Sequence, residues 1–172
     1  VTLNQMSHTF PNDVDIILVG PGGQKAYVMS DMGSGTDIVS VNLTFDDNAA
    51  AALTAAAIVS GTYKPSNIDT NTDVFPGPAP AGPYVSNFNG FAGLSGASVN
   101  GTWSLYVRDD VGTDSGAIAG GWTLNIYTPV CATACSSADL ALVNTPTSGA
   151  TVTAGGNITY TFQATNTGPD SA

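Results

Sequence analysis

The stretch HTFPNDVDIILVGPGG, residues 8–23, decides the fold class of this chain. Its centre, Val14–Val19, is an apolar run interrupted only by Asp15, and the Gly/Pro cluster that follows ends it as a turn ends a strand. Residues 25–30 (KAYVMS) have the pattern of its hairpin partner. Residues 38–45 (IVSVNLTF) alternate apolar and polar side chains, as a strand with one face in water does. The sequence therefore predicts an all-β fold.

The composition supports this fold class. Hydrophobic residues make up 42% of the 172 residues, which is enough to bury a core, and only 9% are charged. With 20 Gly and 10 Pro, the chain has the many turns of an all-β secreted protein. We expect a jelly-roll-like β-sandwich over about residues 3–128, closed by a hairpin of residues 102–108 with residues 118–127. Leu18, Trp103, Leu105, Trp122 and Leu124 are its predicted core residues.

Ala49–Ile58 is a segment with two possible structures. It is rich in Ala and could form one short helix. The alternative is a loop that covers an edge of the sandwich.

The charge is one-sided. Thirteen acidic residues, all of them Asp, stand against Lys25, Lys64 and Arg108, for a net charge of −10. Without a basic patch, binding to nucleic acid or to anionic lipid is excluded as a function. Asp in place of Glu favours turns and sites for hard cations over helices. The alternative is a merely soluble, or halophilic, acidic surface.

Calcium is the ligand that the Asp pattern favours. The ion takes six to eight oxygen ligands, and residues 109–116 (DDVGTDSG) place three carboxylates in one Gly-containing turn. Further Asp residues lie at the ends of predicted strands, and a sandwich gathers such loops at its two ends. We predict bound Ca²⁺ through a subset of Asp13, Asp46, Asp47, Asp109, Asp110 and Asp114. The alternative is that these residues form only Asx-turns and caps.

The two cysteines, Cys131 and Cys135, mark a predicted linker. Four residues apart in a Ser/Thr/Ala-rich stretch, they suit a local disulfide in an exported protein, with free thiols as the alternative. We divide the chain into a sandwich over residues 1–129, a linker over 130–138 and a further β-segment over 139–172. In that segment, residues 139–144 and 158–165 have strand patterns.

One ordered series of motifs runs through residues 3–128: His8-Thr9, Asp13-Val14, Gly20-Pro21-x-Gly23, Phe45-Asp46-Asp47, Gly61-x-Tyr63-x-Pro65, Phe88-Asn89-Gly90, Gly101-Thr102-Trp103-x-Leu105, Asp109, Gly116 and Trp122-x-Leu124. With these motifs the segment resembles the P domain, the β-sandwich that follows the catalytic domain of subtilisin-like proprotein convertases, in the variant found in bacterial secreted and surface proteins.

A second series lies in the C-terminal segment: Ala138-Asp139-Leu140, Val152-x-Ala154-Gly155-Gly156, Tyr160-Thr161 and Thr165-Asn166-x-Gly168-Pro169. With these motifs residues 139–172 resemble the opening of the Ig-like "conserved repeat" modules of large bacterial surface proteins.

The resemblance to the P domain implies an accessory module without catalytic chemistry of its own, and the residues agree. A serine hydrolase needs Ser, His and Asp together, and this chain has one histidine, His8, and no Gly-x-Ser-x-Gly elbow. Asp46 and Asp47 are adjacent, so on a strand they point to opposite faces and suit a glycosidase poorly. We therefore expect no enzyme activity.

These observations predict a non-catalytic structural, assembly or adhesion module of a bacterial surface or secreted protein, extracellular and calcium-stabilised. No signal peptide or membrane-spanning run is present in the sequence. The expected partners are further domains of the same polypeptide or other subunits, in a homo-oligomer or a filament formed by strand sharing. One alternative is the accessory domain of a secreted subtilisin-like protease. Another is a carbohydrate-binding jelly roll that uses Tyr27, Tyr84 and Tyr106.

Overall fold

The structure is a computed structural model of residues 1–172, and it describes residues 1–68, 73–127, 140–146 and 160–166. The chain forms two compact units, Val1–Tyr127 and Thr128–Ala172. Each unit is described by itself.

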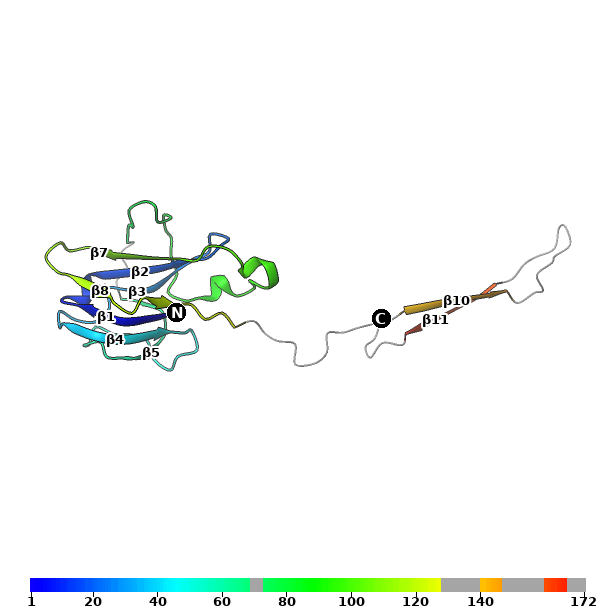
Figure 1. The fold of residues 1–172 in the computed structure, drawn as a ribbon, viewed down its shortest axis with the longest axis horizontal. Coiled ribbons are helices and arrows are strands. Elements are labelled where there is room, and N and C mark those ends of the chain that lie inside the picture. The colour runs from blue at the N-terminus through cyan, green and yellow to red at the C-terminus, as the bar shows by residue number, and fades with distance from the viewer. Residues whose placement is uncertain (69–72, 128–139, 147–159, 167–172) are drawn as a thin grey trace. The chain divides into compact units, whose positions relative to one another are not determined.

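The first unit consists of two mixed β-sheets, which form separate layers in Figure 1. The first sheet has the order β5-β4-β1-β8, with β9 also paired to β1, and the second has the order β6-β3-β2-β7. The first contains β1 (Thr2–His8), β4 (Ile38–Phe45), β5 (Gly61–Tyr63), β8 (Gly116–Ile118) and β9 (Trp122–Thr123). The second contains β2 (Val14–Val19), β3 (Lys25–Ser30), β6 (Ser66–Asn67) and β7 (Ser104–Asp109).

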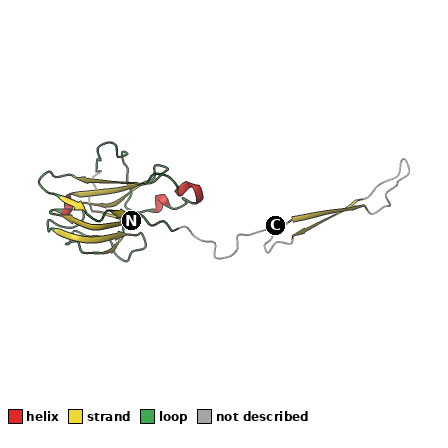
Figure 2. Ribbon diagram, in the orientation of Figure 1, coloured by secondary structure: helices red, strands yellow, loops and turns green. Residues whose placement is uncertain are grey.

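Helical structure in the described residues is limited to three short 3₁₀ turns, η1 (Pro11–Asp13), η2 (Asn89–Phe91) and η3 (Gly96–Val99). Figure 2 draws helical structure in red and strands in yellow. None of the described helices is long and apolar enough to cross a bilayer. The predicted all-β class is confirmed, and so is the hairpin of residues 14–19 with 25–30, which forms as β2–β3.

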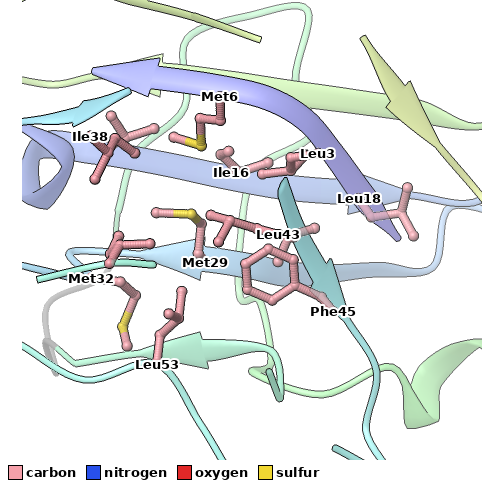
Figure 3. Packing of buried hydrophobic residues seen from close by; sticks show 13 residues of the cluster. Leu3, Met6, Ile16, Leu18, Met29, Met32, Ile38, Leu43, Phe45 and Leu53 are labelled. Atoms are coloured by element: carbon pink, nitrogen blue, oxygen red, sulfur yellow. The ribbon is translucent and has the colours of Figure 1, made fainter. Parts of the chain in front are cut away.

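The main core lies between the two sheets, where side chains from both layers meet (Figure 3). The buried members labelled there include Leu3 and Met6 of β1, Leu43 and Phe45 of β4, Ile16 and Leu18 of β2, and Met29 of β3. Because strand residues alternate between faces, the intervening β2 residues Asp15 and Ile17 point to the outer face of the second sheet. That outer face is also covered, since Ile17 packs with Tyr27, Phe75 and Tyr84 in a second apolar cluster. Burial on both faces explains why β2 is an almost continuous apolar run.

The closing hairpin predicted for residues 102–108 and 118–127 is wrong. Instead, β7 pairs with β2 in the second sheet, whereas β8 and β9 pair with β1 in the first. The connection after Asp109 crosses from one sheet to the other, so the two strands never become neighbours.

The predicted core residues have unequal burial. Leu18 is buried, but Trp103, Leu105 and Leu124 are only partly buried against the core. Trp122 is 36% exposed, which corrects its assignment to the core. The reason is position: β9 has two residues and pairs only with the start of β1, so Trp122 lies at an open edge of the sheet.

Ala49–Ile58 contains no helix and is a loop, which confirms the alternative proposed for it. Its two large apolar residues, Leu53 and Ile58, are buried in the main core. The loop therefore covers the sandwich by burying these two side chains.

The described part of the second unit is one hairpin, formed by β10 (Leu140–Pro146) and β11 (Tyr160–Asn166). The strands pair antiparallel from Leu140↔Asn166 to Pro146↔Tyr160 without a register shift. Both lie where the sequence predicts strands. The linker 130–138 with Cys131 and Cys135, and hence the predicted disulfide, lies outside the described residues.

Candidate metal centre

The six predicted calcium ligands divide between the two ends of the sandwich. Asp13 precedes β2, and Asp109, Asp110 and Asp114 lie at the end of β7 and after it. Val14 is the register partner of Asp109, and the Asp110 N–H donates to the Asp13 carbonyl over 3.0 Å, so these four residues share one end. The pKa of Asp13 is raised by partial desolvation and by the nearby charges of Asp110, Asp114 and Asp109.

Asp46 and Asp47 follow β4 at the other end, beside Val1. An Asp46 carboxylate oxygen accepts the Asn48 N–H at 2.8 Å, which is an Asx-turn. Both Asp47 oxygens accept the Phe88 N–H, each at 2.9 Å. Each side chain therefore has a local structural partner, and the two do not join the group at the first end.

His8 is buried next to the group at the first end. Its Nδ1 accepts the Phe10 N–H at 3.1 Å, which assigns the proton to Nε2. Nε2 lies 3.2 Å from an Asp109 oxygen, to which it donates. Both ring nitrogens are thus engaged in hydrogen bonds. These bonds connect Phe10, in the chain that leads into β2, with Asp109 at the end of β7.

A second acidic group, which the sequence analysis did not predict, lies on the outer face of the second sheet. It consists of Asp15 on β2, Asp31 directly after β3 and Asp73 at the start of residues 73–85, the covering segment, which packs on this face through Phe75 and Tyr84. One carboxylate oxygen from each lies within 4.8 Å of the other two. Among the described residues it is the one group of three or more His, Cys, Asp or Glu side chains that converges so closely.

The Ser30 hydroxyl lies among these three carboxylates. Its Oγ is 2.9 Å from Asp15 Oδ1, 2.6 Å from Asp73 Oδ2 and 3.4 Å from Asp31 Oδ2. A serine hydroxyl has one hydrogen, so it donates to one of these oxygens at a time. The two of these three oxygens that do not receive the hydrogen face a lone pair of the Ser30 oxygen.

Asp15 has the most unusual environment of the three. Its side chain is 0% exposed, and its Oδ2 has no hydrogen-bond donor. The nearest cation is Arg108, whose Nη1 lies 3.8 Å from that oxygen, beyond hydrogen-bond distance. Burial raises the pKa of Asp15 to about 7; the Ser30 hydrogen bond lowers it, and the charges of Asp73, Asp31 and Asp110 raise it further.

Two further groups lie beside the carboxylates. Burial and a hydrogen bond with Asp73 raise the pKa of the Tyr27 phenol. Asn67 is the register partner of Ser30 in the parallel β3–β6 pair, so both side chains leave the sheet on the same face. Asn67 Oδ1 is buried and has no hydrogen-bond donor, so a second oxygen in this region lacks a partner.

The sequence contained one sign of this group. A charged residue inside a strand that is otherwise apolar needs a partner, because an isolated buried carboxylate is costly. Asp15 in VDIILV is such a residue. Its companions could not be identified, because Asp73 is 58 positions away in a Pro-, Asn- and Gly-rich stretch with no periodic pattern.

Comparisons of the chain with protein-family models, with curated proteins and with solved structures found no match. The ligand that the triad suits is therefore inferred from its own side chains. They offer only oxygen atoms, with no His or Cys, and such a group suits a hard cation.

Proposed function

We propose that this chain is a non-catalytic module of an extracellular bacterial protein, a P-domain-type sandwich stabilised by calcium. The all-β fold with two sheets over residues 1–127 supports the proposal, because the P domain that the motifs resemble is a β-sandwich. The net charge of −10 supports a role that involves protein or cation partners in place of nucleic acid.

The main support for a module without catalytic activity is the environment of His8, the one histidine of the chain. A catalytic base must present a free ring nitrogen to the group whose proton it removes. The Nδ1 of His8 accepts from Phe10, its Nε2 donates to Asp109, and the residue is only 6% exposed. This side chain holds the structure together and has no nitrogen left for a substrate.

The purified chain is expected to show no turnover of peptide or glycoside substrates above the buffer blank. His8→Ala is expected to lower the free energy of unfolding by about 2 kcal/mol, because it removes two hydrogen bonds and leaves a buried cavity. Urea unfolding measures the second effect. A turnover that disappears in folded His8→Ala or Asp46→Asn protein would contradict the proposal.

A further inference from the structure

We propose that Asp15, Asp31 and Asp73 bind one calcium ion on the outer face of the second sheet. This inference rests on the calcium-stabilised module proposed above and places its ion at residues other than the six that the sequence favours. Asp15 supplies the ligand from within the sheet, Asp31 from the turn after β3, and Asp73 from the covering segment.

The spacing of the three carboxylates fits one ion. Calcium–oxygen distances are about 2.3–2.6 Å, so two oxygens bound to the same ion are at most about 5 Å apart. The selected oxygens of the triad are all within 4.8 Å of one another. They can therefore surround a single ion with only small adjustments of side chains.

The hydrogen bonding around Asp15 leaves one of its buried oxygens without a donor, and Arg108 stays beyond hydrogen-bond distance of that oxygen. Asp15 Oδ2 is buried without a donor, and the single hydrogen of Ser30 is shared between Asp15 Oδ1 and its other close neighbour, Asp73 Oδ2. A buried acceptor that has left water without finding a donor costs about 1–3 kcal/mol, and more when it is charged. A cation between these oxygens removes the deficit in one step.

The charges favour a divalent ion. Three carboxylates with Arg108 nearby sum to −2, which a doubly charged ion neutralises. Carboxylate, amide and hydroxyl oxygens are the ligands of a hard cation, and Asn67 Oδ1, which has no donor, is a neutral oxygen on the same face of the sheet. Calcium fits better than magnesium, because ligands from three separate segments match its flexible coordination better than a strict octahedron.

A calcium ion at this position would fasten the covering segment to the sheet. The segment packs on the sheet through apolar side chains and the backbone. Phe75 and Tyr84 belong to the same apolar cluster as Tyr27, and the Tyr27 N–H donates to the Val85 carbonyl at 2.9 Å. Asp73 is the one carboxylate that this segment contributes to the triad. Bound calcium would therefore stabilise the folded unit by linking Asp73 to Asp15 and Asp31.

The test compares thermal unfolding of the full 172-residue chain in EDTA and in millimolar CaCl₂. We expect calcium to raise the Tm of the wild type by about 5–10 °C when it exceeds its Kd about 100-fold. Asp15→Asn and Asp73→Asn should each remove most of this rise. Asp37→Asn deletes the same charge from an exposed loop and should leave the rise unchanged.

Each outcome distinguishes the site from the broader proposal. If Asp110→Asn or Asp114→Asn abolishes the calcium effect while Asp15→Asn and Asp73→Asn retain it, calcium binds at the end of β7, and the site proposed here is wrong although the calcium-stabilised module stands. If calcium leaves the wild-type Tm unchanged, both the site and the calcium part of the proposed function fail. Should Asp15→Asn not fold, Asp73→Asn, which changes a residue outside the sheets, decides the question alone.

Discussion

Replacing Gly116 with Ala is expected to lower the free energy of unfolding of the 1–127 unit by about 3 kcal/mol, at the upper end of what overpacking costs. A Cβ on Gly116 would lie 2.1 Å from His8 Cδ2 and 2.5 Å from the Ser7 carbonyl oxygen. Neither neighbour can retreat easily. The Ser7 carbonyl belongs to the backbone of the paired strand β1. The His8 ring is buried, and hydrogen bonds with Phe10 and Asp109 hold both of its nitrogens.

Gly112→Ala is the matched control, since Gly112 lies in the same β7–β8 connection and a Cβ there meets no atom within 4 Å. Chemical unfolding of the two variants and the wild type, followed by intrinsic tryptophan fluorescence, measures the difference. Gly112→Ala should unfold within about 0.5 kcal/mol of the wild type. Equal stability of the two variants would show that β8 does not pack on His8 as described.

Without calcium, the 1–127 unit is expected to lose about 2–4 kcal/mol of stability as the pH rises from 4 to 8 because of Asp15 alone. Its pKa is about 7 in the folded state against 3.8 ordinarily, so in this window the folded state binds more protons than the unfolded state. Stability then falls with rising pH, by up to about 1.4 kcal/mol for each unit of pKa difference. The stabilising contribution is complete below pH 3.8 and is lost by about pH 7.

Urea unfolding of the wild type and Asp15→Asn in calcium-free buffer from pH 4 to 8 measures this effect. The difference between the two proteins isolates Asp15 from the other groups around it, which are Asp31, Asp73, Asp110, Arg108 and Tyr27. Asp13, whose pKa is also raised, contributes the same slope to both proteins. Parallel pH profiles would show that Asp15 is not held in a desolvated site.

Periodicity was sufficient to predict the strands with the strongest patterns. The runs at residues 14–19, 25–30 and 38–45 form β2, β3 and β4. Their apolar side chains leave water only when the strands pack into the core. Strand partners were less predictable. The Asp/Gly turn after Asp109 has the composition of a hairpin turn, yet the chain there passes between sheets, and local sequence does not distinguish the two connections.

The candidate site shows the same limit. The sequence analysis grouped Asp109, Asp110 and Asp114 because they are close in the chain. The triad instead joins residues 16 and 42 positions apart, which only the folding of the covering segment brings together. The almost continuous apolar run of β2 agrees with burial on both faces, but it does not identify the segment that covers the outer face. The expectations of strand sharing and of a Cys131–Cys135 disulfide concern residues 128–172, of which the structure describes only the β10–β11 hairpin, and both stay predictions.

An X-ray structure of crystals grown with calcium, or with manganese in its place, tests the central claim most directly. Anomalous difference density would locate the ion without reference to any assumed ligand. We predict one peak between β2 and the covering segment, about 2.3–2.6 Å from oxygens of Asp15, Asp31 and Asp73. A peak among Asp13, Asp109, Asp110 and Asp114 only, or three carboxylates joined through hydrogen bonds with no peak between them, would contradict it.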